Sequence, residues 1–374
     1  MRHPASDQQR PRRYVAIDGL RFVAAMGVVA HHYAGLAGAP WAEALFAKYY
    51  LFVDFFFAIS GFVIFHNYGS RLSNLSAYGD FLRNRIARVY PLHLLTFLGY
   101  AALALTIWRD KTDRSFVDAA AIAPNLLLAH AWGTTGGTSF NYPSWSISAE
   151  WLAYLAFPLV VWLIARGGAK GALVAAGLIV AGLEFAAHAG LIEPWTTLTF
   201  HFGALRALPT FLIGAALAHG IEAAPLRLPG FAVAWTAFAC AIAAMTLGVD
   251  DRIILALLMA SVATTAIAER DGASGLLTNP AMARLGDLSY AIYMIHPLLA
   301  VALINFAALK ALHLAGASLT IWCFSCGIVA NIVLATLLHR WVEVPARDWL
   351  RHLRLPGFTA ASVSRRAAAL QPWS

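Results

Sequence analysis

Residues 17–33 read IDGLRFVAAMGVVAHHY and place Arg21 and His32 inside a long apolar segment. Eleven residues of α-helix turn through roughly 1100°, so these two side chains lie about 20° apart on one face and about 16 Å apart along the axis. A charged side chain at membrane depth is costly and usually faces a bundle interior or a wet cavity. We therefore expect Arg21 and His32 to lie near opposite ends of a shared cavity.

The whole chain is apolar enough for a protein that crosses a membrane many times. Hydrophobic residues make up 60% of its 374 residues and charged residues 12%, and the mean hydropathy is +0.65. Stretches of about twenty apolar residues recur, which is the length of a membrane-spanning helix, and helices satisfy the backbone where no water is present. We predict an all-α polytopic transmembrane helix bundle with ten spans, at residues 13–35, 48–68, 89–108, 146–165, 171–190, 200–219, 230–248, 252–269, 288–309 and 318–341.

Arginines are concentrated in three stretches that share one side of the membrane if there are ten spans. Short cytoplasmic loops carry such an excess, so we expect both termini to be cytoplasmic. The stretches are the N-terminal arm with Arg2, Arg10, Arg12 and Arg13, the second loop with Arg71, Arg83, Arg85 and Arg88, and the C-terminal tail with Arg340, Arg347, Arg351, Arg354, Arg365 and Arg366. The net charge of +8 therefore indicates membrane lipid as a partner, and no nucleic acid.

The chain is expected to contain a basic arm (1–12), a membrane domain (13–350) and a basic tail (351–374). Residues 117–132 are apolar but short and contain Pro124, so we predict a re-entrant or interfacial element on the outer side. Cys323 and Cys326 form a C-x-x-C without a partner pair, which favours helix packing over metal or redox chemistry. No metal site is expected.

Six motifs follow one another in a characteristic order. The first is the segment quoted above, with its Arg-x10-His spacing. The others are FVDFFFAISGFVIF (52–65), FLRNRIARVYPLH (81–93), YPSWSISAEWLAYLAFP (142–158), LGDLSYAIYMIHPLL (285–299) and HRWVEVPAR (339–347). In this order and spacing they resemble the acyltransferase-3 family of integral membrane O-acyltransferases, over about residues 13–350.

The resemblance implies transfer of an acyl group, usually acetyl, from cytoplasmic acyl-CoA to a hydroxyl. The acceptor in such a family is commonly a cell-surface glycan, such as a polysaccharide or lipopolysaccharide, or a lipid-linked sugar precursor. Acetyl-CoA is then a donor substrate, and no permanently bound cofactor is expected. The family also implies location in the bacterial inner membrane.

Three residues are expected to be catalytic. An alcohol attacks a thioester well only when a base takes its proton, and neutral histidine is the commonest such base near pH 7; the family pattern and helix geometry both select His32 over His31. Arg21 lies near the cytoplasmic end of the same helix, where a guanidinium can bind phosphate, and Asp18 is positioned to orient it. Glu150 is expected at a depth similar to His32, where it would orient the imidazole or receive the acceptor hydroxyl.

The second basic loop is the predicted site for the CoA moiety. Clustered arginines are the expected device for recognising phosphate. We assign Arg85 and Arg88 to this role, with Arg83 and Tyr90 as further members of the same motif. Topogenic charge alone would also account for such a loop.

Five further residues are expected to line the substrate cavity. Asp54, Arg206 and His296 lie in apolar surroundings, where each needs a partner or water. Trp145 and Ser148 complete the motif around Glu150. Two pairs at helical i, i+4 spacing are interpreted as structural: Glu184 with His188, and Glu343 with Arg347.

Two other protein classes fit the same pattern. Basic-flanked helices with intramembrane Arg, His and Glu also describe a secondary transporter of a lipid-linked sugar or other small molecule, although no repeat relates the two halves. A sensory membrane module without catalysis is a further alternative. The sequence leaves open the acceptor, the acyl chain length, the oligomeric state, and the choice between direct transfer and an acyl-histidine intermediate.

Overall fold

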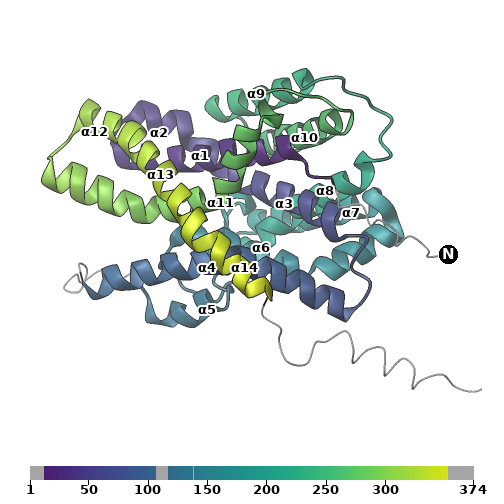
Figure 1. Cartoon of the computed structure of the whole chain (residues 1–374), viewed down its shortest axis with the longest axis horizontal. Coiled ribbons are helices and arrows are strands. Elements are labelled where there is room, and N and C mark those ends of the chain that lie inside the picture. Colours follow the sequence, from purple (N-terminus) through teal and green to yellow (C-terminus); the bar gives the residue numbers. More distant parts are fainter. Residues whose placement is uncertain (1–11, 107–116, 138, 353–374) are drawn as a thin grey trace, which may run out of the picture.

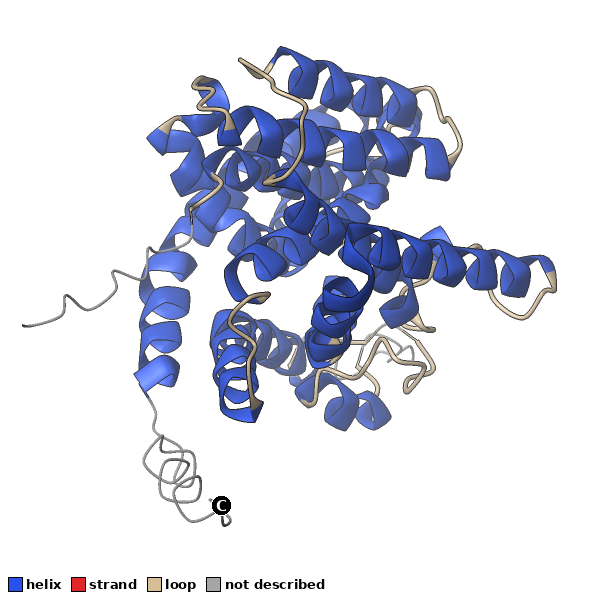
Figure 2. Ribbon diagram, turned by 90° about the vertical axis from the view of Figure 1, so that its right-hand side faces the viewer, coloured by secondary structure: helices blue, strands red, loops and turns tan. Residues whose placement is uncertain are grey.

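The computed structural model describes residues 12–106, 117–137 and 139–352. Within these ranges every regular element is a helix and there is no strand (Figure 2), which confirms the predicted all-α polytopic bundle. The predicted N-terminal arm up to residue 11 and the tail beyond residue 352 lie outside the described residues. The α-helices are α1 (Val15–Ala37), α2 (Pro40–Phe46), α3 (Phe52–Tyr68), α4 (Leu75–Leu105), α5 (Ile122–Leu126), α6 (Trp145–Leu155), α7 (Phe157–His188), α8 (Gly203–Ile221), α9 (Ala232–Thr246), α10 (Asp251–Arg270), α11 (Pro280–Ala300), α12 (Gly316–Trp322), α13 (Ile328–Leu338) and α14 (Val344–His352).

Helices α1, α3, α8 and α11 form the centre of the bundle (Figure 1). Helices α3 and α8 pack with their backbones in contact, because Gly61 and Gly214 have no side chain to separate them. A Cβ atom on Gly61 would lie 2.0 Å from the carbonyl oxygen of Phe211, and one on Gly214 would lie 1.9 Å from that of Ala58. Small residues at such crossings are typical of membrane helix packing. Gly61, the glycine of the motif at residues 52–65, is therefore required by packing.

Each predicted span coincides with helix, but the described residues contain eight helices long and apolar enough to cross a membrane. Two features account for the difference between these eight helices and the ten predicted spans. The predicted spans 146–165 and 171–190 meet within α7, whose backbone breaks at Gly168 with φ of 60°. Helix α9 has 15 residues and so spans about 22 Å, short of the roughly 30 Å hydrocarbon layer.

Helix α4 begins much earlier than the predicted third span. It starts at Leu75, where the side chain of Asn74 accepts a hydrogen bond from Ala77 N at 2.9 Å as an N-cap, and it continues through Pro91. Three of the four arginines expected in the second loop, Arg83, Arg85 and Arg88, therefore lie within a helix. Helix periodicity then decides which of them face the bundle.

The final predicted span, 318–341, lies within a longer helical run from Gly316 to His352. This run consists of α12, α13 and α14, joined by π-helical turns at Cys323–Gly327 and His339–Glu343. A further π-helical stretch, Val301–Ala311, extends α11. Helix α14 returns to the bundle and packs on the N-terminal half of α4 (Figure 1). Residues far apart in the sequence are thereby brought together at one end of the molecule.

The segment at 117–132 does not cross the bundle as a helix, in agreement with the prediction. Its longest helix, α5, has five residues. It is held by side chains of α4, because the hydroxyl of Tyr90 donates to the carbonyl of Leu126 at 3.1 Å and His93 Nε2 bonds to the carbonyl of Asn125 at 3.0 Å. This element supports the turn that leads into α6.

Candidate active site

Helix α1 presents Arg21 and His32 to two neighbouring cavities. Arg21 lines one of about 100 Å³, which we call the arginine cavity, and His32 lines one of about 280 Å³, the histidine cavity. Val53 and Tyr293 line both cavities. The predicted shared cavity is thus two chambers separated by a thin wall.

The arginine cavity gathers Arg21 from α1 with Arg85 and Arg88 from α4. Spacings of three and four residues place successive side chains on one helix face, which brings Arg85 and Arg88 together. Arg85 lies against Tyr68, with its guanidinium carbon 5.4 Å from the ring centroid and Nη2 3.5 Å from the hydroxyl. The three guanidinium groups outnumber the one carboxylate that lines the same chamber, that of Glu150.

Arg83 and Tyr90, also predicted for this site, lie outside it. Arg83 forms an ion pair with Asp80 at 2.9 Å, and the hydroxyl of Tyr90 donates to the 117–132 element. A different helix face carries each of them, because they are two residues from Arg85 and Arg88 respectively and so about 200° away. The structure therefore assigns them to helix support.

His32 lines the histidine cavity and is hydrogen-bonded to His296 behind it. Nδ1 of His32 lies 2.8 Å from Nε2 of His296, and Nδ1 of His296 lies 2.7 Å from the carbonyl oxygen of Tyr293. The ring of Tyr142 packs edge-on against His32 at 5.1 Å between centroids. His296, predicted to line the cavity, is fully buried behind His32.

The carbonyl of Tyr293 fixes the tautomer of both imidazoles. A carbonyl oxygen only accepts, so His296 Nδ1 carries the hydrogen, and Nε2 of the neutral ring is then an acceptor. His32 must donate from Nδ1, and its Nε2 keeps a free lone pair. This assignment follows from the hydrogen-bond network, and it gives His32 the form that a general base requires.

Tyr293 forms much of the wall between the two chambers. Its hydroxyl donates to the carbonyl of Pro143 at 3.0 Å and accepts from Ser146 Oγ at 2.9 Å. Its ring packs at 6.0 Å from both Phe56 and His296. Together with Val53 it lines both cavities, so a group that passes directly from one cavity to the other passes beside these two side chains.

The opposite side of the histidine cavity is built on a buried ion pair. Arg206 donates to both carboxylate oxygens of Asp54, at 3.1 Å from Nε and 2.6 Å from Nη2. Its guanidinium carbon lies 5.1 Å from the ring centroid of Trp145 and 5.6 Å from that of Tyr50. Arg206 and Trp145 line the cavity, whereas Asp54 lies behind Arg206 and holds it in place.

Glu150 is not brought to His32. It lines the arginine cavity together with Tyr154, because positions 146, 150 and 154 of one helix share a face. The predicted orienting role therefore passes from Glu150 to His296. The sequence could not reveal this, since two helix ends at equal depth can still face different chambers.

Two other predicted substrate residues serve the framework. Ser148 Oγ accepts from the backbone N–H of Ala131 at 2.9 Å, so it holds the turn that precedes α6. Asp18 binds Arg13 at 2.7 Å and lies 3.9 Å from Arg21, so the expected link between Asp18 and Arg21 exists but is long.

Glu343 pairs with Arg88 and with His339, and not with Arg347 as predicted.

The connection between α5 and α6 is fixed by a buried histidine. His130 Nε2 lies 3.0 Å from Ser144 Oγ, and the ring stacks on His93 at 5.8 Å. Burial, with His93 beside it, lowers the pKa of His130 to about 3. His130 is therefore neutral at physiological pH and helps to position Tyr142 and Pro143, which line the histidine cavity.

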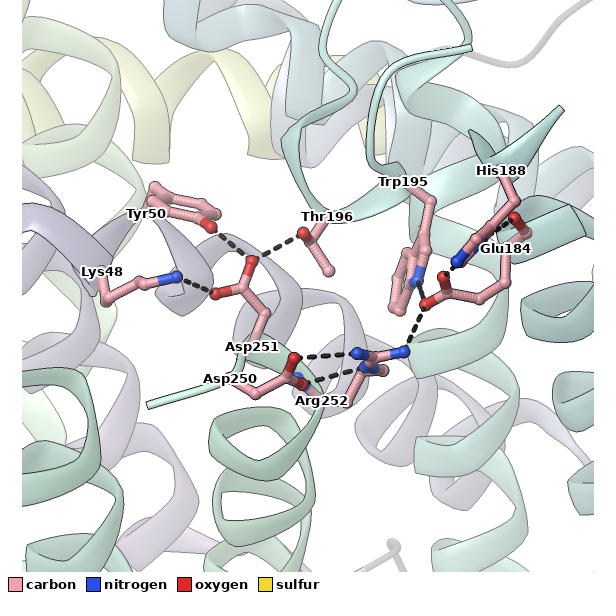
Figure 3. A network of polar contacts seen from close by, with 9 residues as sticks. All are labelled: Lys48, Tyr50, Glu184, His188, Trp195, Thr196, Asp250, Asp251 and Arg252. Atoms are coloured by element: carbon pink, nitrogen blue, oxygen red, sulfur yellow. Dashed lines mark hydrogen bonds and ion pairs between the residues drawn. The ribbon is translucent and has the colours of Figure 1, made fainter. Parts of the chain in front are cut away.

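A polar cluster borders the histidine cavity (Figure 3). Its centre is Asp251, which accepts hydrogen bonds from Lys48 at 2.6 Å, Thr196 at 2.7 Å and Tyr50 at 2.5 Å. Tyr50 also lines the histidine cavity, so it joins the two regions. The cluster lines a hollow of about 350 Å³.

The second half of this cluster is organised by Arg252. It binds Asp250 at 2.8 Å and Glu184 at 3.5 Å, and hydrogen bonds from Arg252 lower the pKa of Asp250 to about 2. Glu184 also accepts from Trp195 Nε1 at 2.9 Å. The predicted pair of Glu184 with His188 is present at 3.9 Å, as one part of this larger network (Figure 3).

Sequence reasoning missed Tyr293 and Tyr50 as site residues. Tyr293 precedes His296 by three positions, and this spacing alone indicates a shared helix face. Tyr50 carries no comparable signal, because it lies in a short 3₁₀ turn between α2 and α3. Its role depends on where α10 places Asp251.

Comparison with known proteins agrees with the motifs. The family model described as an acyltransferase domain matches residues 14–340. The chain is 28% identical to acyltransferase MdmB of Streptomyces mycarofaciens over 76% of this chain and 78% of that protein. It is 39% identical to protein 2 in the picA locus of Rhizobium radiobacter over 27% of this chain and about half (51%) of that protein. No solved structure matches. The chain belongs to the acyltransferase-3 family and is a multi-pass membrane acyltransferase.

Proposed function

We propose that this protein transfers an acetyl group from cytoplasmic acetyl-CoA to a hydroxyl of a glycan or lipid-linked sugar, in a bacterial inner membrane. The observation that carries the proposal is the hydrogen-bonded chain from the Tyr293 carbonyl through His296 to His32. It leaves the Nε2 lone pair of His32 free at the histidine cavity, and the neighbouring chamber is lined by Arg21, Arg85 and Arg88. A base next to an anion-binding chamber is what CoA-dependent transfer to an alcohol requires.

The donor is proposed to enter through the arginine cavity. Arg21 and Arg85 line this chamber, and neither is committed to a carboxylate closer than 3.9 Å in the described part of the chain. Guanidinium groups bind phosphate in a bidentate manner. The thioester would then reach His32 by passing Tyr293 and Val53, which both chambers share.

The chemical step balances with His32 alone as the proton carrier. Nε2 of His32 takes the proton of the acceptor hydroxyl, and the oxygen attacks the thioester carbonyl carbon. The carbon–sulfur bond then breaks, and the CoA thiolate takes the proton back from the imidazolium. His296 stabilises the imidazolium form by accepting from Nδ1, which is the positioning role that a carboxylate has in a hydrolase triad.

Arg206 is proposed to stabilise the charge that develops on the carbonyl oxygen. It lines the same cavity as His32 and is held by Asp54, so it needs no reorganisation during the reaction. Fixed donors aimed at developing charge are usually the largest single contribution to such catalysis. The acceptor is proposed to enter past Tyr50 and the polar cluster, whose hydroxyl, carboxylate and ammonium groups suit a polyhydroxyl ligand.

Purified protein in lipid, radiolabelled acetyl-CoA and a membrane glycolipid extract provide the test. Label is expected in the glycolipid with wild type and with His219→Ala, since His219 is exposed on α8, but not with His32→Ala. Equal labelling by His32→Ala, at an equal folded amount, would contradict the assignment. Label that remains on the wild-type protein when acceptor is omitted would replace direct transfer by the acyl-histidine route.

A further inference from the structure

Arginines of α4 and α14 gather at one end of the bundle. Arg85 and Arg88 lie on α4, and α14, which packs against it, contributes Arg347 and Arg351. Arg351 lies within electrostatic range of Arg347 and Arg85, and Arg88 lies within range of Arg21, Arg347 and Arg85. The ion pair between Arg88 and Glu343 joins these two parts of the chain directly. The arginines of α4 and α14 thus form one cationic cluster next to the arginine cavity, which Arg85 and Arg88 line.

The carboxylates in contact with this surface do not balance its charge. Glu343 is fully buried and binds Arg88, and the exposed Asp348 lies 3.6 Å from Arg347. In the described ranges no carboxylate pairs with Arg85 or Arg351. The four arginines therefore exceed their carboxylate partners by two positive charges.

Two guanidinium nitrogens in the cluster lack an acceptor. The Nε atoms of Arg85 and Arg347 are both buried and find no hydrogen-bond partner among the described residues. The carboxylate nearest to Arg347 Nε is that of Asp348, at 3.6 Å, which is too far for a hydrogen bond. A buried donor without an acceptor is costly, and more so on a charged group. One such nitrogen lies on α4 and one on α14, and both lie in a region with an excess of positive charge. Together they indicate an anionic ligand that bridges the two helices.

We propose that Arg347 and Arg351 of α14 complete, with Arg85, the site for the phosphate groups of the acyl-CoA nucleotide. The inference rests on the proposed function, because it places the nucleotide next to the chamber through which the thioester is proposed to enter. Glu343 binds Arg88 and not Arg347, its predicted partner. The guanidinium of Arg347 is therefore not held by a buried carboxylate and can bind a phosphate group. An anionic lipid headgroup carries the same phosphate chemistry, so the experiment must separate the two sources.

The test uses the whole protein in phosphatidylcholine nanodiscs, titrated with CoA and with dephospho-CoA. The double variant Arg347→Gln/Arg351→Gln is expected to bind CoA about tenfold to a hundredfold more weakly, since a hydrogen bond to a charged group contributes roughly 1.5–3 kcal/mol. The matched control is Arg340→Gln, because Arg340 is exposed and precedes α14. It should keep CoA affinity within about twofold, by the small effect of surface charges.

The outcomes separate the inference from the proposed function. CoA binding by the double variant at wild-type affinity would overturn the inference and leave the function standing. A double variant that binds CoA normally but retains less phosphatidylglycerol from mixed nanodiscs would likewise overturn it and identify lipid as the ligand. Folded wild-type protein that binds neither CoA nor dephospho-CoA would remove the proposed function and this inference together.

Discussion

Replacing His296 tests whether it sets the tautomer of His32. Asn approximates the Nδ1 end of the imidazole, which donates to Tyr293, and Gln approximates the Nε2 end, which accepts from His32. His296→Gln therefore keeps an acceptor for His32, whereas His296→Asn removes it. Both variants lose a similar ring volume, so each serves as the packing control for the other.

The magnitude follows from the 2.8 Å contact between the two imidazoles. A net hydrogen bond contributes about 0.5–1.5 kcal/mol, so loss of the acceptor alone lowers the population of the active tautomer of His32 by roughly 2- to 13-fold. Loss of orientation adds to this, up to the whole contribution of a general base, about 10²–10⁴-fold. We expect kcat to fall at least tenfold in His296→Asn and clearly less in His296→Gln.

The assay is release of the CoA thiol from acetyl-CoA in the presence of the glycolipid extract, with folded protein measured by thermal unfolding. KM for acetyl-CoA should be unchanged in both variants, because His296 does not line the arginine cavity. A fall in kcat at constant KM marks an interaction made in the transition state. Equal kcat in both variants, or a raised KM with kcat unchanged, would refute the tautomer argument.

Three other perturbations have defined outcomes. Gly214→Ala should lower the free energy of unfolding by at least about 1–3 kcal/mol through overpacking, because its Cβ would lie 1.9 Å from a backbone carbonyl of α3; Gly177→Ala, with open space around it, should leave the thermal transition almost unmoved. Arg206→Met should destabilise by about 3–5 kcal/mol by leaving a buried carboxylate unpaired, and adding Asp54→Leu should restore most of the loss; a double variant less stable than the single would contradict this. The pKa of His130 is lowered to about 3 in the folded state, against about 6.5 in the unfolded chain. Its contribution to stability is therefore fully present above pH 6.5 and is lost as the pH falls, by about 2 kcal/mol at pH 5. The difference in unfolding midpoint between pH 7 and pH 5 should shrink in His130→Gln, and an unchanged difference would count against the assignment.

Much of the fold could be predicted from the sequence, because the signals that define it are local. A membrane helix satisfies its own backbone, so apolar length alone predicts where helices lie. The spacing of Arg21 and His32 likewise predicts a shared face, which the structure bears out by giving each a cavity along α1. The break at Gly168 falls between the predicted spans 146–165 and 171–190, as expected. The start of α4 at Leu75 was not predicted, because the first turns of this helix are polar and carry no signal of apolar length.

The partners of the site residues required the tertiary structure. His296 is 264 residues from His32, and Arg206 is 152 from Asp54. Glu150 at a plausible depth faces the other chamber. Within one helix the backbone fixes the direction of every side chain, so the sequence determined which residues share a face. Which faces meet depends on how the helices approach and rotate against each other. Small residues such as Gly61 and Gly214 determine this approach only through the partner helix that packs against them.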